Sequence, residues 1–198
     1  MSVNIDNIHY LYHYYEASIG PFINLSELPI CEAEKILGDI KSRAKTFAAK
    51  RTSDYMKIRR ELEQKARSIF IHKGGEPIRN VPHYMTLGPC SWLLDWYEDG
   101  KELCIHIDMF SEGQVSFTYG DLFPTMRYND GKPYRNTIYT KQEIYEIIKT
   151  YGLPQDWNKT GSKGPERYIE VQIWDDEPIK AYLAKGNFKG LPPVVNSE

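Results

Sequence analysis

The chain has 198 residues, 41% of them apolar and 26% charged, which is the balance of an ordinary single globular domain. The formal net charge of −2 gives no overall attraction to nucleic acid, and no apolar stretch approaches the roughly 20 residues of a membrane span. Three widely spaced cysteines without a CxxC pair, and a start without a signal-peptide pattern, favour a cytoplasmic protein.

The first half of the sequence predicts one strand followed by two helices. Residues 8–17 are rich in aromatic side chains and indicate a strand. A helix is expected from Pro29, because proline suits the first helical position and apolar residues then recur at helical spacing. A longer helix is expected over 53–71, with Gly74 as its stop. Cys31, in the first of these helices, is expected to be a small core residue.

The second half predicts shorter and less regular elements. Thr140 and Glu143 have the spacing of a capping box, which places a helix start there. Cys104 falls in a predicted strand and is again expected in the core. The expected elements are a short helix over 91–97, strands over 103–109, 115–119 and 168–174, and a helix over 140–152.

These elements do not alternate regularly between strand and helix. We therefore expect an α+β domain with a mixed or antiparallel sheet and flanking helices rather than a doubly wound fold. The sequence predicts one domain over residues 1–184 and a loose C-terminal tail over 185–198, where glycine, proline and asparagine accumulate.

A basic segment lies in the region of the two predicted helices. Eleven lysines and arginines fall between Lys41 and Lys73, and only Asp54, Glu61 and Glu63 oppose them. A basic helix can follow a phosphate backbone, but the same pattern is typical of a solvated helix face. Both interpretations are open at this point.

Motifs that identify an enzyme class outright are absent from the sequence. There is no Walker loop, no Rossmann glycine triplet, no HExxH and no GxSxG, and the histidines lack the spacing of a metal site. The 15 tyrosines and 4 tryptophans suit a binding cleft and a core alike.

Three polar positions are candidates for chemistry, each with a structural alternative. His13 lies in an aromatic strand and can donate to a sugar or phosphate, or it is a satisfied structural histidine. Tyr119 precedes Gly120, which allows close approach to a ligand or a plain turn. Glu170 shares a strand face with Tyr168 and Trp174, where it stabilises positive charge in a cleft or is simply exposed.

In this order, the three segments resemble ADP-ribosyltransferases, particularly the DarT-type toxins that modify nucleic acid. The family's first strand and the start of its first helix are similar to LYHYYEASIGPFINLSEL of this chain. The family's aromatic second strand is similar to VSFTYGDLFPTM, and the strand of its essential glutamate is similar to ERYIEVQIWDDEPI. Together these pieces cover about a fifth of the chain, and their order carries the resemblance.

The resemblance implies NAD as a substrate and a site without a metal. His13 would contact a ribose of NAD, Tyr119 would stack on the nicotinamide, and Arg51 would hold the pyrophosphate or a nucleic-acid phosphate. Glu170 would hydrogen-bond the ribose 2′-hydroxyl and stabilise the oxocarbenium-like state as nicotinamide leaves. Tyr168 stands where many relatives carry Gln or Glu two residues before this glutamate, so the target, nucleic acid or protein, is not indicated.

Two other function classes remain open from the sequence. One is a non-enzymatic binding protein with a protein or nucleic-acid partner, for which the basic segment and the aromatic residues are the motivation. The other is a metal-independent nuclease that uses His83 or His106, because two histidines suffice for general acid–base chemistry.

Overall fold

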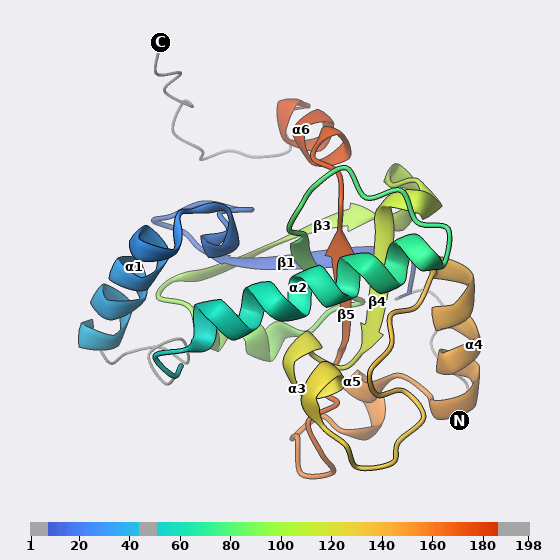
Figure 1. The fold of residues 1–198 in the computed structure, drawn as a ribbon. Helices are drawn as coiled ribbons and strands as arrows, with labels where there is room; N and C mark the ends of the chain where they lie inside the picture. The colour runs from blue at the N-terminus through green and yellow to red at the C-terminus, as the bar shows by residue number, and fades with distance from the viewer. Residues whose placement is uncertain (1–7, 44–50, 186–198) are drawn as a thin grey trace.

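The structure, a computed structural model, describes residues 8–43 and 51–185 (Figure 1). Five strands form one sheet: β1 (Tyr10–Glu16), β2 (His83–Leu87), β3 (Gly100–His106), β4 (Val115–Tyr119) and β5 (Ile169–Ile173). The helices of the described residues are α1 (Ile30–Arg43), α2 (Tyr55–His72), α3 (Leu122–Arg127), α4 (Lys141–Tyr151), α5 (Pro154–Trp157) and α6 (Glu177–Ala184). Short 3-10 helices include η2 (Leu25–Glu27) and η4 (Ser91–Trp96).

The sheet is open and antiparallel, with the strand order β3-β1-β2-β5-β4. The α+β class expected from the sequence is therefore confirmed. Strands β1 and β3 pair over seven residues, whereas β1 and β2 pair only at Leu11 with Leu87 and at Tyr12 with Thr86. The sheet consequently divides after Tyr12, because β1 and β2 no longer hydrogen-bond beyond this point.

The two faces of the sheet differ in chemistry because side chains alternate along each strand. One face, called the apolar face, carries Leu11, Met85, Phe117 and Val171 and packs against Ile144 of α4. The other, called the polar face, carries a row of side chains in register across the five strands. This row consists of Cys104, Tyr12, Thr86, Glu170 and Thr118.

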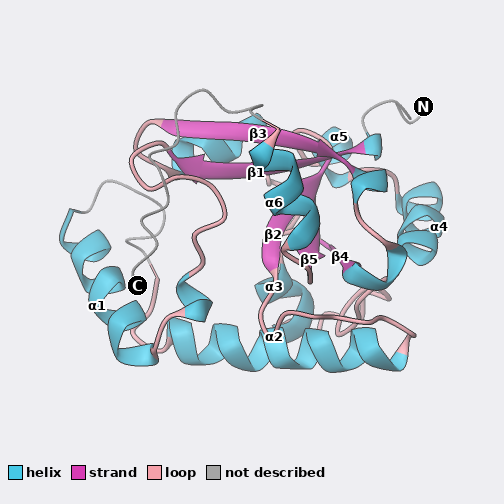
Figure 2. Ribbon diagram, turned by 90° about the horizontal axis from the view of Figure 1, so that it is seen from above, coloured by secondary structure: helices cyan, strands magenta, loops and turns pink. Residues whose placement is uncertain are grey.

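Helix α2 crosses the polar face, as Figures 1 and 2 show from two directions. Its residues Leu62, Ala66 and Phe70 pack against Trp174, which follows β5. Arg67 fixes the helix further, because its Nε donates to the carbonyl of Arg79 at 3.0 Å. Burying a side chain of the size of Leu62 or Phe70 stabilises the fold by about 1.5–3 kcal/mol.

Several local predictions are confirmed and others are wrong. The capping box is present: Thr140 Oγ1 accepts from the Glu143 amide, and the Glu143 carboxylate accepts from the Thr140 amide. Strand β3 begins and ends three residues earlier than expected. Cys31 and Cys104 are exposed rather than core residues, since each lies on the outer side of its element. Apart from Lys185, the expected tail lies outside the described residues.

Candidate functional site

A cavity of about 550 Å³ lies between the polar face of the sheet, the N-terminal end of α2, α1 and η4. It is called the large cavity below. Ten of its 30 lining residues are tyrosine, tryptophan or phenylalanine, and Tyr12, Tyr84, Tyr168, Tyr55 and Trp96 come from five different elements or connections. Concave sites of this size with an aromatic wall and a few polar groups are typical of ligand pockets.

Glu170 of β5 is one of the polar groups in this cavity. Its residue is only 7% exposed, so the alternative of an exposed strand residue is wrong. One carboxylate oxygen accepts from the Leu122 amide at 3.3 Å and from Gln172 Nε2 at 3.2 Å. Burial, together with repulsion from the nearby Asp121, raises the pKa of Glu170 well above its usual range.

Asp121 forms the second carboxyl of the same cavity wall. It caps α3, accepting from the Phe123 amide at 2.8 Å, and it accepts from the hydroxyl of Tyr168 at 3.0 Å. Burial raises the pKa of Asp121, while these two hydrogen bonds and the charge of Arg51 oppose the rise. Both carboxyls therefore take up a proton more readily than they do in water, and the rise in pKa is the larger for Glu170.

Tyr84 lies on β2, between β1 and β5, and its ring also faces the large cavity. Its hydroxyl donates to Glu63 of α2 at 2.8 Å, and Glu63 accepts in addition from Ser26 Oγ and Arg59 Nε, each at 2.9 Å. Glu63 is completely buried behind the cavity wall. This network fixes Tyr84 and Arg59 toward the cavity, with the Arg59 guanidinium 5.0 Å from the centre of the Tyr84 ring.

His13 lines the large cavity at the point where β1 and β2 separate. Its Nε2 accepts from the Phe22 amide at 2.9 Å, so Nδ1 carries the hydrogen and donates to the carbonyl of Tyr84 at 2.9 Å. Burial lowers the pKa of His13 to about 4, which keeps the ring neutral. Both nitrogens are thus used within the protein, as the structural alternative predicted, and His13 holds β1, β2 and the Phe22 loop together.

Arg51 lines the same cavity, with its guanidinium 4.4 Å from the centre of the Tyr55 ring. Arg51 and Arg59 are the two arginines of this wall. Both lower the pKa of Asp121 through their charge, which places positive potential on the side of the cavity that faces this carboxyl. Two guanidinium groups can bind a diphosphate, because their planar forks match phosphate oxygens.

Tyr119 does not line the large cavity, in contrast to its expected stacking role. It neighbours Thr118, which lies on the polar face, so alternation directs the Tyr119 ring to the apolar face. There the residue is fully buried, its hydroxyl donates to the carbonyl of Gly152 at 2.8 Å, and Trp157 Nε1 donates to that hydroxyl at 3.1 Å. The tyrosine that lines the large cavity between the strands of His13 and Glu170 is Tyr84, on β2.

The basic segment is not a free phosphate track over most of α2, although Lys57 and Lys65 are exposed as a solvated face would have them. Arg67 binds backbone carbonyls, Arg60 donates to the carbonyl of Leu28, and Lys65 donates to Asn136 at 3.0 Å. Lys73 pairs with Glu143 at 2.8 Å. These bases connect α2 to the surrounding loops, and Lys45 and Lys50 lie outside the described residues.

His83 and His106, the candidates for a nuclease, have different partners. His83 is buried and shares a hydrogen bond of 2.9 Å with Asp176, and burial lowers its pKa to about 4. His106 instead stacks near His9 at the end of β3. Within residues 8–43 and 51–185, no three histidine, cysteine or acidic side chains gather as a metal site would require.

Sequence reasoning missed Tyr84, Arg59, Glu63 and Asp121. The segment HYMTL contains a period-2 signal, with Tyr84 and Thr86 alternating against apolar residues, but it is too short to stand out. The burial of Glu63 has no signal in the sequence, because an acidic residue in a charged helix usually faces solvent.

Comparison of the chain with protein-family models, with curated proteins and with solved structures gives no match. Of the helices within the described ranges, none has both the length and the hydropathy that crossing a membrane requires.

Proposed function

We propose that the large cavity is the site of an NAD-dependent ADP-ribosyl transfer to a nucleic-acid or protein target. The observation that carries this proposal is the position of Glu170, buried in an aromatic cavity that also holds Asp121 and two arginines. The volume suits a dinucleotide, the aromatic rings suit its bases, and Arg51 and Arg59 suit its diphosphate.

The reaction requires a negative group beside the ribose as its glycosidic bond breaks. The bond between ribose C1 and the nicotinamide nitrogen breaks, its electron pair stays with nicotinamide, and positive charge develops on the sugar. Ionised Glu170 offsets this charge, and a preorganised carboxylate does so far better in a dry cavity than in water. The positive charge of the nicotinamide ring of bound NAD lowers the pKa of Glu170 and so favours its ionised form.

Transfer also needs a group that removes a proton from the acceptor. A nucleophilic oxygen or nitrogen of the target forms the new bond to ribose C1 and loses its hydrogen as a proton. We assign this role to Asp121, because it shares the cavity wall with Glu170 and the hydrogen bonds from Phe123 and Tyr168 favour its charged form. His13 acts indirectly, as a positioning residue for β1 and β2.

The test is transfer of label from NAD labelled in its adenylate phosphate to separate pools of DNA, RNA and protein. We expect label in one pool with the wild-type chain and loss of at least about 100-fold with Glu170→Gln. Glu112→Gln, an exposed glutamate outside the cavity, is the matched control and should transfer as the wild type does. No label in any pool, or equal label with Glu170→Gln, rules the transfer out.

A second candidate is a binding protein that holds its ligand without turnover. The observation that favours it is the apolar rim of the large cavity, where Ile19 is 55% and Ile23 is 67% exposed. This reading predicts saturable binding of an apolar aromatic ligand with NAD left intact. Ligand-detected NMR with an aromatic fragment set distinguishes it from the first candidate.

A further inference from the structure

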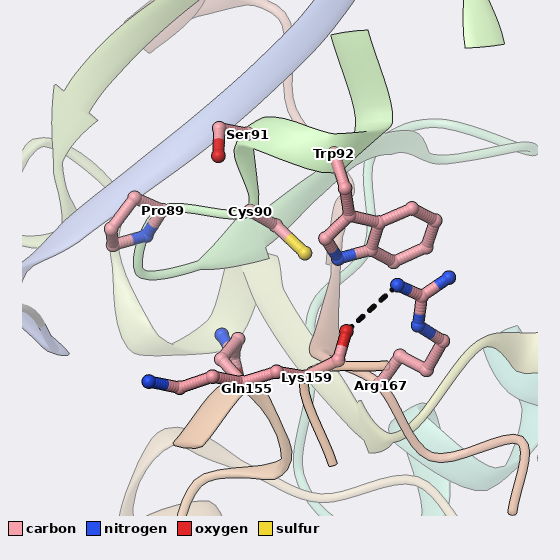
Figure 3. A pocket seen from close by; sticks show the side chains of 7 residues that line it. All are labelled: Pro89, Cys90, Ser91, Trp92, Gln155, Lys159 and Arg167. Atoms are coloured by element: carbon pink, nitrogen blue, oxygen red, sulfur yellow. Dashed lines mark hydrogen bonds between the residues drawn. The ribbon is translucent and has the colours of Figure 1, made fainter. Parts of the chain in front are cut away.

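A second, smaller cavity of about 240 Å³ lies behind η4 (Figure 3). It is called the small cavity below. Trp92 of η4 lines it, whereas Leu93 and Trp96 of the same short helix line the large cavity. The other side of the small cavity comes from Gln155 of α5 and from Lys159 and Arg167, at the two ends of the loop between α5 and β5.

Arg167 is held in place by two contacts. Its guanidinium carbon is 3.5 Å from the centre of the Trp92 ring, and one terminal nitrogen donates to the carbonyl of Lys159 at 2.9 Å, the dashed line in Figure 3. The Nε of Arg167 is buried and has no hydrogen-bond partner among the described residues. A positioned guanidinium with an unused donor is a binding group for an oxyanion.

Gln155 contributes an unused acceptor to the same cavity. Its Nε2 donates to the carbonyl of Leu87 at 2.6 Å, and because a carbonyl can only accept, this contact fixes which amide atom is nitrogen. The remaining Oε1 is buried and has no partner within the described part of the chain. Buried polar atoms are nearly always paired in proteins, so a donor and an acceptor left over in one small cavity require a partner.

The charge of the small cavity favours an anion. Lys159 makes no ion pair and no side-chain hydrogen bond to the residues that the structure describes. The residues that line the cavity include Lys159 and Arg167 but no aspartate or glutamate. The thiol of Cys90, also in the lining, is neutral, because burial raises its pKa to about 12.

We infer that the small cavity binds a phosphate group that carries a hydroxyl hydrogen. Arg167 Nε donates to a phosphate oxygen, the phosphate hydroxyl donates to Gln155 Oε1, and the exposed Lys159 ammonium adds positive charge at the edge of the cavity. The volume leaves room beside the phosphate for part of the molecule to which it is attached. This inference does not depend on the chemistry of the large cavity.

The test is a titration with inorganic phosphate and with sulfate at constant ionic strength, near pH 6, followed by the NMR signals of the Trp92 indole and the Arg167 side chain. We expect saturable binding of phosphate and at least about tenfold weaker binding of sulfate, which has no hydrogen for Gln155 at this pH. This comparison needs no variant. Equal affinity for the two anions, or no saturation with phosphate, overturns the inference.

Variants then locate the site. Arg167→Gln should weaken phosphate binding about tenfold, because it removes a charged hydrogen-bond donor, and Lys159→Gln should weaken it less, because it removes only a charge at the edge of the cavity. Lys163→Gln removes a charge from the same loop outside the cavity and should bind as the wild type does. If Lys163→Gln weakens binding as much as Arg167→Gln, the affinity is diffuse surface electrostatics and the inference is wrong.

Discussion

At the scale of single residues, a one-position change along a strand decides which phenol reaches the large cavity. Tyr119 and Thr118 are neighbours, and the sheet turns Thr118 toward Glu170 and Tyr119 toward the opposite face. The sequence shows a tyrosine before a glycine but not the direction of its ring. Tyr84 has the right direction because its register partner on β5, Gln172, shares the face of Glu170.

Because the two rings point to different faces of the sheet, we expect different results from replacing each tyrosine by phenylalanine. Tyr84→Phe removes the hydroxyl that contacts Glu63 and loosens the ring in the cavity, so nicotinamide release should fall about tenfold or more. Tyr119→Phe loses contacts to Gly152 and Trp157 only, so it should lower stability and leave the rate per folded molecule unchanged. Rates measured well below each unfolding temperature distinguish the two, and a larger loss in Tyr119→Phe contradicts the assignment.

Glu170 lowers the stability of the fold at neutral pH. Its pKa is raised in the folded state, so the folded protein binds a proton more tightly than the unfolded chain, and stability falls as pH rises above the usual glutamate range. Glu170→Gln keeps an acceptor for the Leu122 amide without this loss. We expect the variant to be about 1–3 kcal/mol more stable at pH 7 and close to the wild type near pH 4 by urea unfolding. A wild-type protein that is the more stable at pH 7 contradicts the buried carboxyl.

The contribution of His13 to the stability of the fold has the opposite pH dependence. Its folded pKa of about 4 lies below the ordinary 6.5, so its contribution is complete above about pH 6.5 and is lost as pH falls toward 4. The loss amounts to at most about 3 kcal/mol. His13→Gln should be less stable at pH 7 and show a flatter fall from pH 6.5 to 4. His83 keeps part of the slope, because burial lowers its pKa to about 4 as well. An unchanged slope in the variant would mean that His13 is not buried neutral.

At the scale of elements, local signals predicted helix ends and the strands β1, β4 and β5 well. The capping box placed α4 correctly, and the alternation of YIEVQIW placed β5 and its core residues Ile169, Val171 and Ile173. The helices α3, α5 and α6 were not predicted, because four to eight residues carry too few helical periods. β2 was missed because only Met85 and Leu87 give it an apolar alternation. Charge patterning did not show that Arg59, Arg60 and Arg67 of α2 make tertiary contacts.

Glu63 is the contact through which α2 holds the large cavity together. Glu63→Gln leaves Arg59 buried beside a neutral group and weakens the contact to Tyr84, so we expect a loss of about 3–5 kcal/mol in the free energy of unfolding. Glu61→Gln, on the exposed side of the same helix, is the control and should stay within about 0.5 kcal/mol of the wild type. Urea denaturation measures both, and equal stabilities would show that the Glu63 network is not structural.

At the scale of the whole molecule, the site is a product of strand order. β2 separates β1 from β5, so His13, Tyr84 and Glu170 come together although 157 positions of sequence separate the first from the last. The sequence supplied His13, Arg51 and Glu170 as members of one site, and all three line the large cavity. It could not supply the division of the sheet after Tyr12, which depends on pairings between distant segments.

Nicotinamide release from NAD with water as the only acceptor, followed by chromatography under single-turnover conditions, decides whether Glu170 acts on NAD. We expect slow release to water by the wild-type chain, a rate that rises with pH as Glu170 ionises, and at least about 100-fold slower release by Glu170→Gln. Intact NAD with the wild-type chain, or equal rates for the two proteins, would contradict it.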